Sequence, residues 1–212
     1  IMYECASAVT HMHEQERPII HRDIKPANIL MTLISGTPTV KLTDLGVSKM
    51  VDPEEMMKTA MFSTVVGTPG YMAPEQYEKK EYGMSVDIFA LGLVFLAMVM
   101  YKGGPDAHLL PLVGGGFMIC PVGQDMMMKA AMKQPQEPVT KIEATDTAQV
   151  KKVKELILQM VRYNPKDRLG IRPAMDKLGQ MLGKGAAPAP AARELTRLPT
   201  PPGSDESSSD DD

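Results

Sequence analysis

The stretch H-R-D-I-K-P-A-N at residues 21–28 constrains this chain more than any other part of its sequence. It puts an aspartate, a lysine two residues later and an amide five residues later between two apolar runs. Apolar, β-branched flanks predict short strands that hold a loop, and loops on a rigid scaffold often carry chemistry. In such a loop Asp23 can orient or accept a proton, Lys25 can neutralise a developing anion, and Asn28 can offer an oxygen to a metal ion. An ordinary charged surface loop is the alternative, which an ordered set of this kind disfavours.

A second acidic motif, D-L-G at residues 44–46, follows the next apolar stretch. Residues 29–33 and 39–43 predict a β-hairpin, because the turn cluster S-G-T-P separates them. Such a hairpin would place Asn28 and Asp44 close together at its two open ends. Carboxylate and amide oxygens are ligands that Mg²⁺ accepts when nucleotide phosphates supply the rest. The sequence therefore predicts a magnesium site at Asn28 and Asp44.

These two motifs together resemble the catalytic loop and the magnesium motif of eukaryotic protein kinases, H-R-D-x-K-x-x-N and D-F-G. Leu45 replaces the usual phenylalanine and keeps the position apolar. The lysine two residues after the aspartate resembles the serine/threonine branch of the family. Residues 67–75, G-T-P-G-Y-M-A-P-E, resemble the segment on which kinases dock their substrates. Residues 47–66, which precede it, resemble the activation loop.

The resemblance implies transfer of the γ-phosphoryl group of ATP to a protein hydroxyl, with Mg²⁺ as the metal. In that reaction Asp23 orients the hydroxyl and accepts its proton, and Lys25 stabilises the transferring phosphoryl group. Thr68 bonds to both and completes the catalytic set. The magnesium ligands would be Asn28 and Asp44. The residues implied for ATP binding are Lys25, Asn28, Leu30 and Asp44.

Two longer-range pairings also follow from the resemblance. Residues 87–92 resemble the D-x-W-x-x-G core helix of kinases, in which the aspartate binds backbone amides of the catalytic loop. Asp87 would have that role here, and a simple helix cap is the alternative. Arg168 resembles the family arginine that pairs with the glutamate of A-P-E, here Glu75.

Apolar spacing predicts helices over residues 1–16, 85–100, 147–163 and 171–182, and a short helix over 125–133. With the hairpin, this is a mainly α, α+β fold. The resemblance covers roughly residues 1–182 and implies the large C-terminal lobe of a kinase, in which the hairpin carries the catalytic and metal loops. The Ala/Pro-rich and then acidic, Ser-rich composition of residues 183–212 predicts a disordered tail.

Several kinase motifs are missing from the sequence. There is no G-x-G-x-x-G strand loop, no V-A-I-K-like lysine strand and no helix with its partner glutamate. The chain also starts without methionine and inside a predicted helix. We therefore expect a fragment with the N-terminal lobe absent, and little turnover from the isolated chain. A non-catalytic kinase-like scaffold or decoy is the alternative function, although a scaffold does not need the complete set of catalytic and magnesium residues.

Arginine directly before the catalytic aspartate suggests a switch. In kinases with this arrangement, a phosphate on the activation loop pairs with the arginine. Thr64 is the best candidate for that phosphate here and Ser63 is the second, and Lys49 resembles a further basic contact. The partners expected are a protein substrate, ATP and an upstream activating kinase.

Composition excludes some other partners. The net charge is −3, and no basic patch with interleaved aromatics indicates nucleic-acid binding. The longest apolar run, residues 88–101, is too short to cross a bilayer, so no membrane partner is expected. Cys5 and Cys120 lie far apart without paired spacing, which indicates an intracellular, cytoplasmic setting, with the nucleus as the open alternative.

Overall fold

The computed structural model describes residues 1–35, 37–51, 64–100 and 142–184. The expected helix over 125–133 and nearly all of the expected tail lie outside these residues. In chain order, the helices and strands are α1 (Met2–His13), β1 (Ile19–Ile20), β2 (Ile29–Ile34), β3 (Thr37–Leu42), β4 (Lys49–Met50), α3 (Pro74–Tyr77), α4 (Ser85–Met100), α6 (Ala148–Met160) and α7 (Ile171–Met181). Short 3₁₀ helices cover Pro26–Asn28, Leu45–Val47 and Pro165–Asp167.

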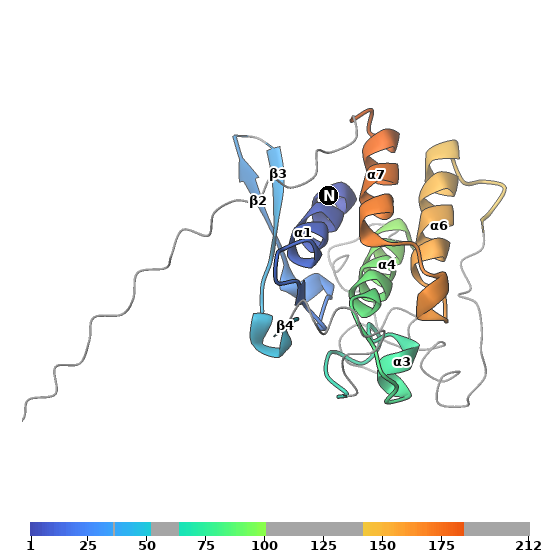
Figure 1. The fold of residues 1–212 in the computed structure, drawn as a ribbon. Helices are drawn as coiled ribbons and strands as arrows, with labels where there is room; N and C mark the ends of the chain where they lie inside the picture. Colours follow the sequence, from blue (N-terminus) through green and yellow to red (C-terminus); the bar gives the residue numbers. More distant parts are fainter. Residues whose placement is uncertain (36, 52–63, 101–141, 185–212) are drawn as a thin grey trace, which may run out of the picture.

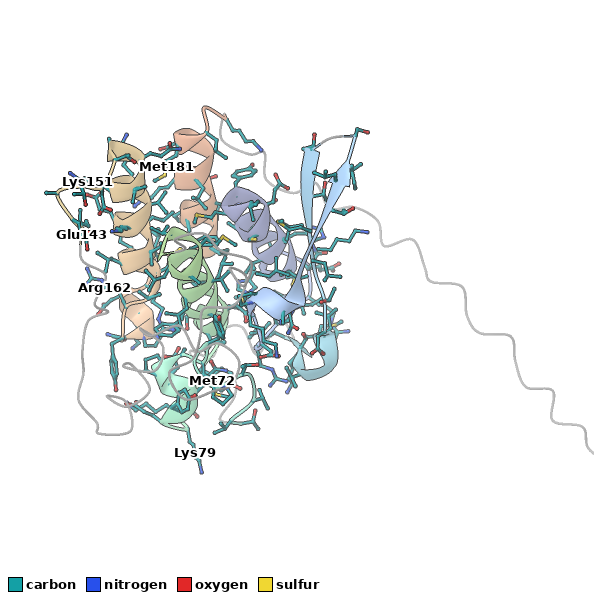
Figure 2. The ribbon with its side chains drawn as sticks, turned by 180° about the vertical axis from the view of Figure 1, so that it is seen from behind. Met72, Lys79, Glu143, Lys151, Arg162 and Met181 are labelled. Carbon is teal, nitrogen blue, oxygen red and sulfur yellow. The ribbon has the colours of Figure 1, made fainter. Side chains whose placement is uncertain are left out.

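Helix α4 is the centre of the core. It is apolar around its whole circumference, and such a helix must be buried on all sides. Figure 1 shows α4 between α1 and α6, and the side chains of these helices fill the space between them (Figure 2). Each large apolar side chain buried in this way contributes about 1.5–3 kcal/mol. The fully buried residues of α4 include Phe89, Leu91, Leu93, Phe95 and Leu96.

Helices α4 and α6 approach each other closely because of one glycine. A Cβ atom on Gly92 would lie 2.6 Å from Val161 Cγ1 and 3.0 Å from Met160 Cβ. A larger residue would push α6 away from the core helix. Although α4 is strongly apolar, no helix in the described ranges is both long and apolar enough to cross a membrane.

Helices α6 and α7 are amphipathic and cover the core from outside. Helix α7 buries Ile171, Ala174, Met175 and Leu178, which follow helical spacing along one face. Thr147 caps α6, since its Oγ1 accepts a hydrogen bond from Val150 N at 3.3 Å. Every helix predicted within the described residues is present, with its ends shifted by a few residues.

Two small antiparallel sheets lie in the first fifty residues. The predicted hairpin is β2 paired with β3, with Ile29 opposite Leu42 at its open end. The second sheet pairs β1 with β4, and Ile20 lies opposite Lys49. Sequence periodicity did not indicate this second sheet, because two-residue strands are too short to show alternation.

The expected fold class therefore needs correction. A helical, kinase-like C-terminal lobe with a single hairpin and an absent N-terminal lobe does not describe this chain. The N-terminal region carries two sheets rather than one hairpin (Figure 1). Strands β1 and β2 directly precede and follow residues 21–28, and strands β3 and β4 flank Asp44.

A buried ion pair joins α3 to the segment after α6. Nη1 and Nη2 of Arg168 donate to the two carboxylate oxygens of Glu75 at 2.5 and 2.7 Å. The remaining guanidinium donors bond to the carbonyl oxygens of Ser85, Arg162 and Tyr163 at 2.7–3.1 Å. All five N–H groups of the guanidinium are thus satisfied, which a buried arginine needs. The pairing expected between Glu75 and Arg168 is confirmed.

Removing one partner of this pair should destabilise the fold strongly. We expect Arg168→Ala to lower the free energy of unfolding by about 3–5 kcal/mol, because it strands the buried Glu75 charge. Arg172 offers a matched control, since its ion pair with Glu14 is partly exposed to solvent. Arg172→Ala should cost less than about 1 kcal/mol. Urea unfolding of both variants measures the difference, and equal midpoints would contradict the assignment.

Candidate active site

The loop at residues 21–28 is fixed to the core by a buried carboxylate. Asp87, in the first turn of α4, accepts hydrogen bonds from His21 N and Arg22 N, each at 2.8 Å. Nε2 of the buried His13 lies 2.8 Å from Asp87 Oδ2 and donates to it. Arg22 has a φ of 67°, an unusual conformation for a residue other than glycine. The two bonds to Asp87 hold the backbone in that conformation, and the amide contacts expected of Asp87 are present.

Three side chains form a closed ring of hydrogen bonds next to this anchor. Lys25 Nζ donates to Asp23 Oδ2 at 2.8 Å and to Thr68 Oγ1 at 2.7 Å. Thr68 Oγ1 in turn donates to Asp23 Oδ1 at 2.6 Å. Asn28 Nδ2 joins the ring through Asp23 O at 2.9 Å and Asp23 Oδ2 at 3.1 Å. The fold thus brings together four of the residues predicted for the site, although Thr68 is 45 positions from Asp23 in the sequence.

The ring determines the charge of Asp23. Burial alone would raise the pKa of this carboxyl, but the hydrogen bonds from Lys25 and Thr68, the positive charge of Lys25 and the bond from Asn28 outweigh burial. The pKa of Asp23 therefore lies below its usual value. Asp23 is a carboxylate at neutral pH and can accept a hydrogen bond from an incoming hydroxyl group.

The segment that carries Thr68 is held by its own contacts. Tyr82 Oη donates to Thr64 O at 2.8 Å, and Gln76 Nε2 donates to Val66 O at 3.1 Å. Farther along, Gly70 N donates to Tyr77 Oη at 3.3 Å. These bonds come from α3 and from the residues just before α4. They present the Thr68 hydroxyl to the catalytic loop.

The predicted magnesium residues occupy the open end of the β2–β3 hairpin. Thr43 N donates to Asn28 O at 3.0 Å, which places Asp44 one residue beyond this bridge. Asn28 turns its nitrogen toward Asp23, and within the described residues its Oδ1 makes no hydrogen bond. Asp44 is exposed, and its Oδ1 accepts only a 3.4 Å bond from Gly46 N. One carboxylate and one amide oxygen fit Mg²⁺ bound together with phosphates.

In the described part of the chain, no group of three or more histidine, cysteine, aspartate or glutamate side chains could hold a metal ion. Leu30, predicted to contact ATP, lies on β2 with 54% of its surface exposed and apart from the hydrogen-bonded ring. The roles of Leu30, Asn28 and Asp44 in binding ATP and Mg²⁺ remain predictions.

Sequence reasoning missed two contacts around the site. The bond from His13 to Asp87, 74 positions away, was not predicted. His21 Nε2 lies 3.0 Å from Thr43 O and links the catalytic loop to the end of β3. No periodicity or spacing in the sequence signals either contact. Only the family motif around residue 21 could have drawn attention to His21.

Comparison with known proteins agrees with this geometry. The family model described as "Protein kinase domain" matches residues 1–178. The match covers the N-terminal region of the chain, so the expectation of a C-terminal lobe with the N-terminal lobe absent is contradicted.

Three curated relatives are similar to the chain. An Aurora kinase of Saccharomyces cerevisiae is 33% identical over 79% of this chain and 37% of its own length. The calcium/calmodulin-dependent protein kinase cmkB of Emericella nidulans is 39% identical over 44% of this chain and 22% of its own length. The serine/threonine-protein kinase PAK 1 of Mus musculus is 42% identical over 48% of this chain and 17% of its own length. The chain thus spans well under half the length of each relative.

Replacing Thr68 should change the ionisation of Asp23. Thr68→Val keeps the shape of the side chain but removes a hydrogen bond that lowers the pKa of Asp23, so that pKa should rise. A carboxyl with a lowered folded-state pKa stabilises the fold above its unfolded pKa, and this contribution is lost as the pH falls through the folded value. In the variant this stabilisation should therefore be smaller, and its loss should be complete at a higher pH than in the wild type.

Carbon-13 NMR of the Asp23 carboxyl group measures the change directly. Thr39→Val is the matched control, because the Thr39 hydroxyl bonds locally to Thr37 O on the hairpin. An Asp23 titration unchanged by Thr68→Val would show that the bond contributes nothing to the charge of the site.

Proposed function

The chain belongs to the protein kinase domain family, and from that premise we propose that it transfers the γ-phosphoryl group of ATP to a serine or threonine hydroxyl of a protein. The ring of Asp23, Lys25 and Thr68 carries the proposal. It supplies an ionised acceptor for the substrate hydroxyl and a cation for the transferring group. A lysine in this position and a threonine bonded to it support serine/threonine specificity.

The two carboxylate oxygens of Asp23 have different hydrogen-bond partners and therefore different proposed roles. Oδ2 already accepts bonds from Lys25 and Asn28. Oδ1 accepts one bond, from Thr68, among the described residues. Each carboxylate oxygen can accept about two hydrogen bonds, so Oδ1 has room for a substrate hydroxyl. Because the pKa of Asp23 is lowered, the carboxylate is a weak base that orients this hydroxyl and takes its proton late.

Lys25, Asn28 and Asp44 would complete the site on the nucleotide side. Lys25 Nζ, beside Asp23, can also stabilise negative charge on the transferring phosphoryl group. Asn28 Oδ1 and the Asp44 carboxylate would hold Mg²⁺. The ion, when bound with ATP, neutralises phosphate charge. Leu30, exposed on β2, offers an apolar surface to the nucleotide base.

The names of the relatives support the same class of activity. PAK 1 is named a serine/threonine-protein kinase, and the other two relatives are named kinases. A protein substrate and ATP are therefore the partners we propose. An intracellular setting belongs to the proposal as well, and it is supported by a free, buried thiol at Cys5.

We expect the catalytic carboxylates to be essential for phosphorylation by the intact protein. Asp23→Asn removes the proton acceptor and should lower the rate of peptide phosphorylation by about 10²- to 10⁴-fold. Asp44→Asn removes the metal-binding carboxylate and should raise the Mg²⁺ concentration needed for half-maximal rate. Glu155→Gln, an exposed charge change on α6, is the control and should leave both quantities unchanged.

Near wild-type phosphorylation in both carboxylate variants would remove the enzymatic proposal. It would favour a kinase-like scaffold, which needs the fold but not the chemistry.

Control by an upstream kinase is part of the proposed function. Thr64 is exposed, and Tyr82 holds it in a defined position: Tyr82 Oη donates to Thr64 O at 2.8 Å and lies 3.4 Å from the Thr64 hydroxyl, which phosphorylation would have to release. Arg22 Nε donates to Val47 O at 2.5 Å and lies half-buried directly before Asp23. A phosphate on Thr64 would bring about −1.5 to −2 charges and three acceptor oxygens toward this cation. Lys49, exposed on β4, is the second basic residue proposed to meet it.

This regulation predicts non-additive losses. Thr64→Ala and Arg22→Gln should each lower the activity of the phosphorylated, intact protein, since each removes one partner of the same charge-assisted contact. The activity of the double variant should be no lower than that of the less active single variant. Peptide phosphorylation measured after treatment with an activating kinase tests this. Losses that simply multiply would show that Arg22 and Thr64 act independently.

A further inference from the structure

Gly67 lies where the segment that carries Thr68 meets the catalytic loop. Its φ is +115°, and a Cβ atom built on it would lie 2.6 Å from Arg22 O. Real Cβ atoms essentially never come within 3.0 Å of a non-bonded heavy atom, so any side chain at position 67 forces a movement. The contact is with a main-chain oxygen rather than with the end of a flexible side chain.

The catalytic loop cannot easily make that movement. The peptide that precedes the Arg22 carbonyl is fixed because Arg22 N bonds to Asp87 Oδ1 at 2.8 Å. His21 N bonds to the other oxygen of the same carboxylate at 2.8 Å. Asp87 is fully buried in the first turn of the core helix, and His13 holds it from the other side. Displacing Arg22 O would therefore disturb a chain of buried contacts.

The segment on the other side of the contact is held next to Gly67 by a part-buried side-chain bond, from Gln76 Nε2 to Val66 O at 3.1 Å, and yields more easily than the buried loop. Thr68 directly follows Gly67 and is connected to the loop by side-chain bonds to Asp23 and Lys25. Behind Gly67, the Met72 Cγ atom would be 3.6 Å from an added Cβ, at ordinary contact distance. Figure 2 shows Met72 at the end of the molecule where α3 lies. A side chain at position 67 would thus move Thr68 away from the catalytic loop.

We propose that Gly67 is a positioning residue. Because its main chain lies directly against Arg22 O, the Thr68 hydroxyl comes within hydrogen-bond distance of Asp23 and Lys25. The proposal deepens the proposed kinase function and rests on it. It also gives the glycine a role that differs from conformational freedom alone. Gly92, the other close approach, meets side-chain atoms of Val161 and Met160 and serves helix packing.

A matched glycine separates the two roles. Gly183 also has positive φ, +68°, but an added Cβ there would meet nothing within 4 Å. Gly183→Ala therefore carries backbone strain without a collision. If strain alone mattered, alanine at either position would have only a stability effect. If the contact with Arg22 O matters, only Gly67→Ala should change the site.

The experiment compares Gly67→Ala, Thr68→Val, the double variant and Gly183→Ala in the full chain. Carbon-13 NMR follows the titration of the Asp23 carboxyl, a readout that does not depend on turnover. We expect Gly67→Ala to raise the pKa of Asp23 as Thr68→Val does, with no further rise in the double variant. Gly183→Ala should leave it at the wild-type value. In the intact protein, kcat should fall roughly tenfold to a hundredfold in Gly67→Ala, as expected for loss of a hydrogen bond to a charged group.

Two outcomes would overturn the proposal, and a third separates it from the proposed kinase function. An Asp23 titration in Gly67→Ala that matches wild type would show that Thr68 keeps its place despite the added Cβ. If the alanine variant does not fold, Gly67→Asn is used, because asparagine tolerates positive φ better and carries the same Cβ. Failure of both to fold would assign Gly67 to folding instead. A raised pKa without any kinase activity in the wild type would keep the positioning role and remove only the proposed function.

Discussion

The structure depends on one buried carboxylate, that of Asp87. A buried charge is costly unless hydrogen bonds satisfy it, and here two main-chain amides and the His13 ring do so. Its place in the first turn of α4 adds the favourable end of the helix dipole. Because α4 is buried in the core, its Asp87 side chain fixes the amides of His21 and Arg22 relative to the core. The conformation that presents Asp23 is thus an outcome of core packing rather than of the loop sequence alone.

The same turn of α4 also positions the other half of the site. Arg168, paired with Glu75 at the start of α3, donates to Ser85 O, and its guanidinium lies 4.9 Å from the centre of the Phe89 ring. Helix α3 and the segment before it are therefore tied to residues that flank Asp87. The loop at residues 21–28 and the segment that carries Thr68 meet with fixed geometry because both are bonded, directly or through Arg168 and Glu75, to the first turn of α4. This explains how Thr68 can reach Asp23 with a bond of 2.6 Å.

Helices, the hairpin and other local features of this arrangement could be predicted from the sequence, whereas few contacts between residues far apart in the sequence could. The boundaries of α4 were predictable because the sixteen residues from Ser85 to Met100 are mostly apolar and contain no proline or turn cluster. The hairpin was predictable from its turn cluster. Asp23, Lys25 and Thr68 could be grouped only through the family resemblance, since spacing says nothing about residues 45 positions apart. The β1–β4 sheet, the His13–Asp87 bond and the approach of Gly67 to Arg22 were missed. Each depends on backbone paths that no local pattern encodes.

The closed ring links the charge of the site to its order. Thr68 Oγ1 accepts from Lys25 while it donates to Asp23, so each bond polarises the next. The bonds favour the ionised form of Asp23 and lower its pKa, and by linkage ionised Asp23 holds Thr68 and its segment in place. Protonation of Asp23 as the pH falls would weaken the bonds from Lys25 and Thr68 together. The ionisation of Asp23 and the order of residues 64–70 are thus coupled: the ionised carboxylate that can receive a hydroxyl is also the form that holds this segment. The main-chain contact at Gly67 helps to determine this coupling.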